Sequence, residues 1–81
     1  MRVKVRFFAV LRERAGTSEI TKEIAEGSTV GDLWEALQRE YPKLAPAKRA
    51  LLYAVNRDYV GVSCVLKDQD EVAFVPPVSG G

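Results

Sequence analysis

The sequence contains no histidine and only one cysteine, Cys64. Histidine is the commonest metal ligand and a frequent general base, and one cysteine can supply neither an internal disulfide nor the four-ligand sets of zinc and plant-type iron–sulfur sites. Cys64 lies in an apolar run without a neighbouring cation, so we expect a buried, unreactive thiol. The chain is predicted to hold no metal, and no side chain in it is expected to catalyse a reaction alone.

The sequence also has no excess of one charge and no long apolar run. Twelve Lys and Arg residues against eleven Asp and Glu residues give a formal net charge of +1, which is unlike the basic surface of a nucleic-acid-binding protein. The first residues, from Arg2 to Arg6, alternate charged and apolar side chains and lack the continuous apolar stretch of a signal peptide or a membrane span. We expect a cytoplasmic protein with no nucleic-acid and no membrane partner.

The length and composition predict one folded domain. The chain has 81 residues, of which 47% are apolar and 28% charged; this balance supports a core and argues against intrinsic disorder. No internal repeat or linker is present. We therefore divide the chain only into a domain over residues 1–75 and a tail over residues 76–81.

The first ten residues alternate in a way that predicts a strand with one buried face. Val3, Val5, Phe7 and Ala9 share one phase of the alternation, and the charged residues share the other. Phe8 falls in the charged phase. It should therefore face away from the core and is a candidate contact residue for a partner.

One long helix is predicted after Thr29, which is a good N-cap with Asp32 three residues later. Apolar residues recur from Val30 to Tyr41 at the spacing of one helical face, and Pro42 ends the helix. Trp34 lies on that apolar face and is interpreted as a core residue.

Strand patterns precede and follow this helix. Together the elements predict an α+β domain in which one helix packs on one face of a mixed sheet of about five strands. The last strand is nearly continuously apolar, which is typical of a central strand. In chain order we expect a strand over 2–10, a helical turn over 11–15, strands over 17–24 and 51–55, a short edge strand over 59–62 and the central strand over 71–75.

The C-terminal tail has an unusual composition. Pro76 and Pro77 lack backbone N–H donors and fix φ, so they end sheet pairing and start the tail in an extended direction. Gly80 and Gly81 have no Cβ and could thread a flexible end through a narrow channel. The terminal carboxylate of Gly81 is ionised at neutral pH, and adenylation followed by attack of a sulfur donor would convert it to a thiocarboxylate.

Several segments of the sequence resemble one known family. The most specific is DEVAFVPPVSGG at residues 70–81, and weaker ones are VRFFA at 5–9, LRE at 11–13, TVGDL at 29–33 and AVN at 54–56. Over the whole chain they resemble the small, sulfur-carrier subunit of molybdopterin synthase, a ubiquitin-like β-grasp family. In that family the turn before the last strand often reads Asp-Gly-Asp, whereas Gln69 stands in the middle here, so Gln69 is expected to be mildly strained if that turn needs a positive φ.

The resemblance implies a function for the tail. An E1-like adenylyltransferase would activate Gly81 with ATP, a persulfide donor would supply sulfur, and the large subunit of molybdopterin synthase would receive the tail. There the thiocarboxylate would donate sulfur to precursor Z to form the dithiolene of molybdopterin. The chain would then be a sulfur-donating subunit rather than an enzyme on its own, with no bound cofactor and with catalytic side chains supplied by the large subunit.

The resemblance also implies a partner-facing surface. In this chain it comprises Phe8, Arg12, Tyr59 and Val75, followed by the diproline exit. The strand phases independently place Phe8 and Val75 on the side away from the helix. Tyr59 is explained equally well as an edge-strand aromatic that is partly exposed and has no partner role. Arg12 is explained better as a surface charge in contact with solvent.

Two other interpretations of the sequence stay open. The same tail chemistry could serve sulfur transfer to thiamin or to a transfer RNA base, or could make the chain a ubiquitin-like modifier joined to lysines. In a different class, the chain could be a non-catalytic β-grasp interaction module whose open sheet face binds a partner while the tail is passive.

Overall fold

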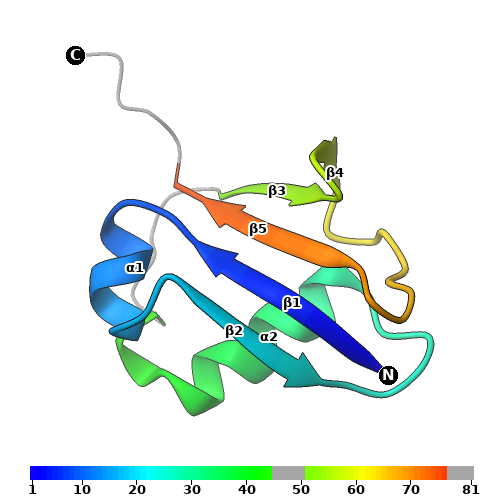
Figure 1. The fold of residues 1–81 in the computed structure, drawn as a ribbon, viewed down its shortest axis with the longest axis horizontal. Helices are drawn as coiled ribbons and strands as arrows, with labels where there is room; N and C mark the ends of the chain where they lie inside the picture. The colour runs from blue at the N-terminus through cyan, green and yellow to red at the C-terminus, as the bar shows by residue number, and fades with distance from the viewer. Residues whose placement is uncertain (45–50, 77–81) are drawn as a thin grey trace.

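A computed structural model describes residues 1–44 and 51–76 of the chain (Figure 1). Within these two ranges, neither α-helix has the length and apolar character that crossing a membrane would require. The elements are, in chain order, β1 (Arg2–Phe7), α1 (Val10–Ala15), β2 (Glu19–Glu23), α2 (Val30–Glu40), the 3₁₀ turn η1 (Pro42–Leu44), β3 (Leu52–Val55), β4 (Asp58–Val60) and β5 (Glu71–Val75).

The five strands form one mixed sheet in the order β2-β1-β5-β3-β4. The central pair, β1 and β5, is parallel, and the other neighbours are antiparallel. Figure 1 shows β5 lying between β1 and β3, with β4 at one edge. The predictions of a mixed five-strand sheet, a central last strand and a short edge strand are confirmed.

The structure corrects the predicted end of the first strand. β1 ends at Phe7, and Ala9 is exposed instead of buried, with a φ of 52°. The chain turns here because the backbone N–H groups of Leu11 and Arg12 donate to the carbonyls of Phe8 and Ala9, which begins α1. Leu11, which is 1% exposed, takes the core position that the alternation assigned to Ala9.

The helix α2 begins at the predicted cap. The Thr29 hydroxyl accepts a hydrogen bond from the backbone N–H of Asp32, and the Asp32 carboxylate accepts one from the backbone N–H of Thr29. This reciprocal pair satisfies two N–H groups that the helix leaves without a partner. The helix ends at Glu40, directly before Tyr41 and Pro42, as predicted.

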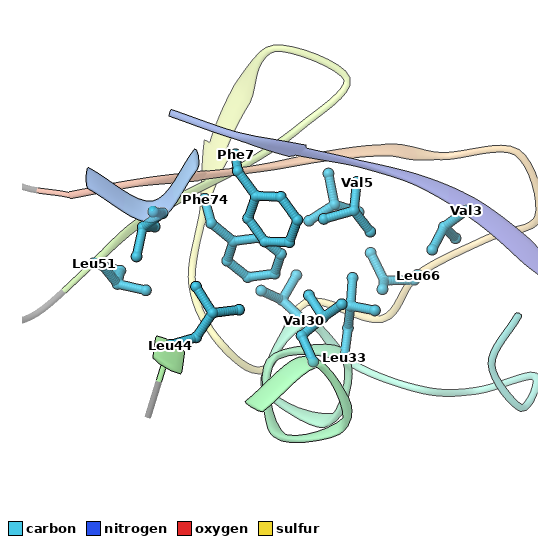
Figure 2. Packing of buried hydrophobic residues seen from close by; sticks show 12 residues of the cluster. Val3, Val5, Phe7, Val30, Leu33, Leu44, Leu51, Leu66 and Phe74 are labelled. Atoms are coloured by element: carbon cyan, nitrogen blue, oxygen red, sulfur yellow. The ribbon is translucent and has the colours of Figure 1, made fainter. Parts of the chain in front are cut away.

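The core lies between the sheet and α2. Figure 2 shows Phe7 and Phe74 projecting from the sheet toward the helix, and Val30 and Leu33 projecting back. Trp34 is half-buried, with its ring centroid 4.9 Å from that of Phe74, so its predicted packing role is confirmed. The fully covered side chains, all below 2% exposure, are Val3, Val5, Leu11, Val30, Leu33, Leu37, Leu44, Val72 and Phe74.

Two turns hold non-glycine residues at positive φ. Asn56 and Arg57, which join β3 to β4, have φ values of 50° and 73°. Gln69, in the turn before β5, has a φ of 71°, which confirms the predicted strain at this position. Gly16, in contrast, ends α1 at a φ of 78°, where glycine has no such penalty.

Candidate functional site

The strand that leads into the C-terminal tail is held at the centre of the sheet. β5 pairs with β1 on one side and β3 on the other, and the fully buried Phe74 anchors its inner face. Pro76 follows the strand directly and is half-buried. The predicted functional residues Pro77, Gly80 and Gly81 lie outside the described residues. The described part of the site is therefore the fixed point from which the tail departs.

The sheet face turned away from α2, which we term the open face, carries a hollow of about 210 Å³. Phe8, Tyr59 and Val75, three of the residues expected to contact a partner, all contribute to its lining. The structure thus brings together side chains that are separated by up to 67 positions (75 − 8) in the sequence. The residues that line the hollow are Arg6, Phe8, Ala54, Arg57, Tyr59, Glu71, Ala73 and Val75.

The strand register explains why the sheet is hollowed at this place. Ala73 of β5 lies opposite Ala54 of β3, so two small side chains form the floor. Ala73 is also aligned with Arg6 of β1, and Ala54 is opposite Tyr59 of β4. Large side chains thus stand on both sides of a small-residue centre, because residues aligned across a sheet share one face.

Part of the rim of the hollow is apolar and exposed. Phe8 is 38% exposed and Tyr59 is 73% exposed. Leu52, which lies opposite Val75 in the register, is 44% exposed and extends the same apolar surface. Leu52 was missed as a site residue, although it lies in the phase of β3 opposite to Tyr53; the sequence could not tell which phase faced the helix.

Two predicted contact residues lie apart from the hollow. Arg12 is exposed on α1 and is not among the lining residues. Pro76 adjoins Val75 but does not line the hollow either. The partner-binding role of these two residues, like that of Phe8, Tyr59 and Val75, stays a prediction.

Charged groups stand at one end of the hollow. The Arg6 guanidinium lies 3.6 Å from the Glu71 carboxylate and 5.5 Å above the centroid of the Phe8 ring. Arg57 lines the hollow too and is exposed. One carboxylate beside two guanidiniums does not attract a metal cation, since the cations outnumber the anion. The hollow is suited instead to an apolar or anionic group.

Outside the hollow, the pKa of the Asp68 carboxyl group is lowered. The Asp68 carboxylate accepts a hydrogen bond of 2.8 Å from the backbone N–H of Arg2. This bond, the hydrogen bond from the Gln69 amide, and the positive charges of the N-terminus and Arg2 lower the pKa of Asp68 from its ordinary value of 3.8. The hydrogen bond between Asp68 and Arg2 joins the turn before β5 to the start of β1.

The single cysteine is not as deeply buried as predicted. Cys64 is half-buried and packs against the edge of the core. Its neighbour Val65 is 56% exposed, because the segment between β4 and β5 runs along the N-terminal end of α2, where Cys64 accepts a hydrogen bond from the backbone of Val30. The apolar run around Cys64 thus lies at the surface, with Cys64 packed against the core and Val65 exposed to solvent.

Comparison with known proteins places the sequence among sulfur carriers and protein modifiers. It is 44% identical to the molybdopterin synthase sulfur carrier subunit of Escherichia coli, with 98% of this chain and 99% of that protein covered. It is 40% identical to the subunit of the same name from Chlamydomonas reinhardtii, with 100% of both covered. Small archaeal modifier protein 3 of Haloferax volcanii is 35% identical, again with 100% of both covered.

Solved structures agree with this placement. SAMP1 from Haloferax volcanii matches with a TM-score of 0.89 at 27% identity, with 100% of both chains covered. A chain from the complex of subunits 1 and 2 of the molybdopterin-converting factor from Helicobacter pylori matches with a TM-score of 0.69 at 26% identity, with 100% of both covered. The predicted ubiquitin-like β-grasp fold is confirmed. Residues 5–81 match the ThiS family, and the chain belongs to that family.

Proposed function

We propose that the chain is the sulfur carrier subunit of a two-subunit molybdopterin synthase and that the C-terminal carboxylate of Gly81 carries the sulfur. The observation that carries this proposal is the identity of 40–44% to proteins of that name over nearly the whole of both chains. The central strand β5, which runs directly into Pro76-Pro77 and a Gly-Gly end, supports it. Sulfur donation then takes place beyond the domain, at the end of the tail.

The proposed chemistry converts the carboxylate to a thiocarboxylate in three steps. ATP adenylates Gly81 and releases pyrophosphate, which gives a mixed anhydride. A persulfide displaces AMP to form an acyl disulfide, and a thiol reduces this to the thiocarboxylate. Donation of the sulfur to precursor Z, with water supplying the oxygen, returns the carboxylate. Gly80 leaves the approach to the reacting carbon free of side chains.

Each of these steps needs a protein other than this chain. An E1-like adenylyltransferase provides the ATP site, a persulfide enzyme provides the sulfur, and the large synthase subunit provides the catalytic side chains. The absence of histidine from the sequence supports this division. We place the chain in the cytoplasm because the adenylation consumes ATP.

The open face is proposed to bind the large subunit. Phe8 and Tyr59 are exposed and line the hollow together with the half-buried Val75, which directly precedes the tail; such apolar surfaces mark protein contacts. A partner bound there would receive the tail as it leaves β5. Arg12 and Pro76 are proposed to contact the periphery of the same partner.

A second candidate function is protein modification. The similarity to small archaeal modifier protein 3 favours it. In this case the activated Gly81 would form an amide with a lysine of another protein instead of receiving sulfur. The two functions share the adenylation step and differ in the nucleophile.

The experiment co-expresses the chain with the E1-like enzyme and measures its intact mass. The wild-type chain is expected to gain the mass difference between one sulfur and one oxygen atom, and to convert precursor Z to molybdopterin once the large subunit is added. Deletion of Gly81 is expected to abolish both results. Arg39→Gln, on the exposed side of α2, is the matched control and should behave as the wild type.

The outcomes separate the candidate functions. Full conversion of precursor Z by the chain without Gly81 would contradict the proposal and favour a passive tail on an interaction module. Covalent conjugates between Gly81 and lysines, with no sulfur-for-oxygen exchange, would favour protein modification. Sulfur exchange without conversion of precursor Z would point to another acceptor, such as thiamin or a transfer RNA base.

A further inference from the structure

The hollow on the open face holds more positive than negative charge. Arg6 and Arg57 line it together with a single carboxylate, that of Glu71. Glu71 lies 3.6 Å from Arg6. Among residues 1–44 and 51–76, no carboxylate lies within ion-pair distance of Arg57. Arg6 therefore has a counter-charge within the hollow, whereas Arg57 has none among the described residues.

The two arginines also differ in how they are held. Arg6 is fixed by Glu71 and by its position over the Phe8 ring, at 5.5 Å from the centroid. Arg57 is exposed, on the turn between β3 and β4. Its side chain can meet an approaching group without first breaking an ion pair.

Arginine at position 57 is not what the turn itself requires. Asn56 and Arg57 have φ values of 50° and 73°, which is the geometry of a two-residue hairpin turn with positive φ at both positions. Glycine is favoured at the second position, and a side chain there costs roughly 1 kcal/mol. The conformation of the turn therefore gives no reason for a guanidinium at the rim of the hollow.

The size of the hollow restricts what it can hold. A volume of about 210 Å³ is below the range of roughly 300–1,000 Å³ that is common for small-molecule pockets. It suffices for one or two protein side chains. Phe8, Tyr59 and Val75 are among its lining residues, so the apolar part of an occupant would contact them while its charged end meets Arg57.

We propose that the hollow receives an acidic side chain of the large synthase subunit, an aspartate or a glutamate, whose carboxylate pairs with Arg57. This inference rests on the proposed function, which places that subunit on the open face. A guanidinium and a carboxylate form a bidentate, charge-assisted pair. Such a pair fixes the register of the partner on the sheet and with it the direction in which the tail enters the partner.

The first test measures the affinity of the purified chain for the large subunit at low and high salt. Arg57→Gln is expected to weaken binding about tenfold, and Arg57→Glu about 100-fold at low salt, with smaller losses at high salt because ions screen the pair. Arg57→Gly removes the charge and suits the turn. It should bind as weakly as Arg57→Gln while unfolding at no lower denaturant concentration than the wild type.

The second test locates the partner carboxylate directly. Arg57→Lys places an amine at the rim, and a carbodiimide then joins that amine to a carboxylate in contact with it. Mass spectrometry of the cross-linked complex is expected to identify an amide between position 57 and one Asp or Glu of the large subunit. Arg39→Lys on α2 is the matched control and should give no cross-link to the partner.

The outcomes separate this inference from the proposed function. Wild-type affinity for Arg57→Glu at low salt, or no cross-link from Arg57→Lys in a complex that forms normally, would overturn the inference and leave the proposed function standing. No binding between the wild-type chain and the large subunit would overturn both. A loss of affinity that is independent of salt would also count against the charge pair.

Discussion

Phe7 and Phe8 are neighbours of the same type, and they lie on opposite faces of the sheet. Phe7 is 2% exposed and packs against Tyr41 and Phe74, with ring centroids 6.1 Å and 6.5 Å away. Phe8 is 38% exposed and stands at the rim of the hollow, under the Arg6 guanidinium. The first face is completed by the chain's own helix, whereas no described element covers the second.

The difference shows how a small domain divides two tasks between two sides of one sheet. The inner face buries a continuous set of aliphatic and aromatic side chains against α2, which stabilises the fold. The open face keeps apolar groups in contact with water beside Ala54 and Ala73, which are too small to fill the space between them. Such a face does little for folding and is suited to a partner.

The largest expected effect is a loss of stability on the inner face. Phe7→Ala should lower the free energy of unfolding by about 3–5 kcal/mol, because it removes a buried ring and leaves a cavity. Phe8→Ala, the same change one residue later, should lower it by less than about 1 kcal/mol. Denaturant unfolding monitored by circular dichroism measures both values.

A chain of this size has a total stability of only about 5–10 kcal/mol, so Phe7→Ala could unfold it. Phe7→Leu keeps most of the buried surface and serves as the variant that retains the fold. It should be less destabilised than Phe7→Ala and more destabilised than Phe8→Ala. Equal losses at positions 7 and 8 would break the comparison between the two faces.

The next effect is a loss of partner affinity on the open face. Phe8→Ala and Tyr59→Ala should each weaken binding of the large subunit by about 1–2 kcal/mol, because each removes an exposed aromatic ring that the partner would cover. Isothermal titration calorimetry measures the affinity. Glu35→Ala, at an exposed position of α2, is the control, and unchanged affinity in both aromatic variants would assign the hollow no part in binding.

The smallest effect concerns Asp68, which belongs to neither face. Its pKa in the folded chain lies below 3.8, so the ionised carboxylate contributes stability at neutral pH, and this contribution is lost as the pH falls below about 4. Asp68→Asn should therefore be less stable than the wild type at pH 7, and the difference should shrink at pH 3. Unfolding at the two pH values measures it; a difference that grows on acidification would contradict the assignment.

Much of the fold could be predicted from the sequence because its signals are local. The cap at Thr29 and Asp32, the stop at Pro42 and the alternation from Val3 to Phe7 each depend on residues a few positions apart. The prediction was wrong at Ala9: the alternation of the sequence extends to this residue, but the strand has already ended and the chain turns into α1. A regular pattern does not reveal the residue at which hydrogen bonding changes partner.

The candidate site was predicted less completely. Phe8 and Val75 were predicted from the family resemblance and from the strand phases, which place both on the side away from the helix. Leu52 and Arg57 were missed. Whether Leu52 faces the helix or the open side depends on how β3 pairs with β5, and Arg57 joins the hollow only through the β3–β4 turn.

The sequence by itself directed attention to the tail: it has no histidine, one cysteine and a Gly-Gly end, and the carboxylate of Gly81 is the reactive group that we propose. It also determined the elements, because caps, stops and periodicities are short-range. Only the tertiary structure decided that Arg6, Ala73, Ala54 and Tyr59 share one row and enclose a hollow. The reason is physical: strand register sets which side chains meet, and register is fixed by packing between segments that lie far apart in the chain.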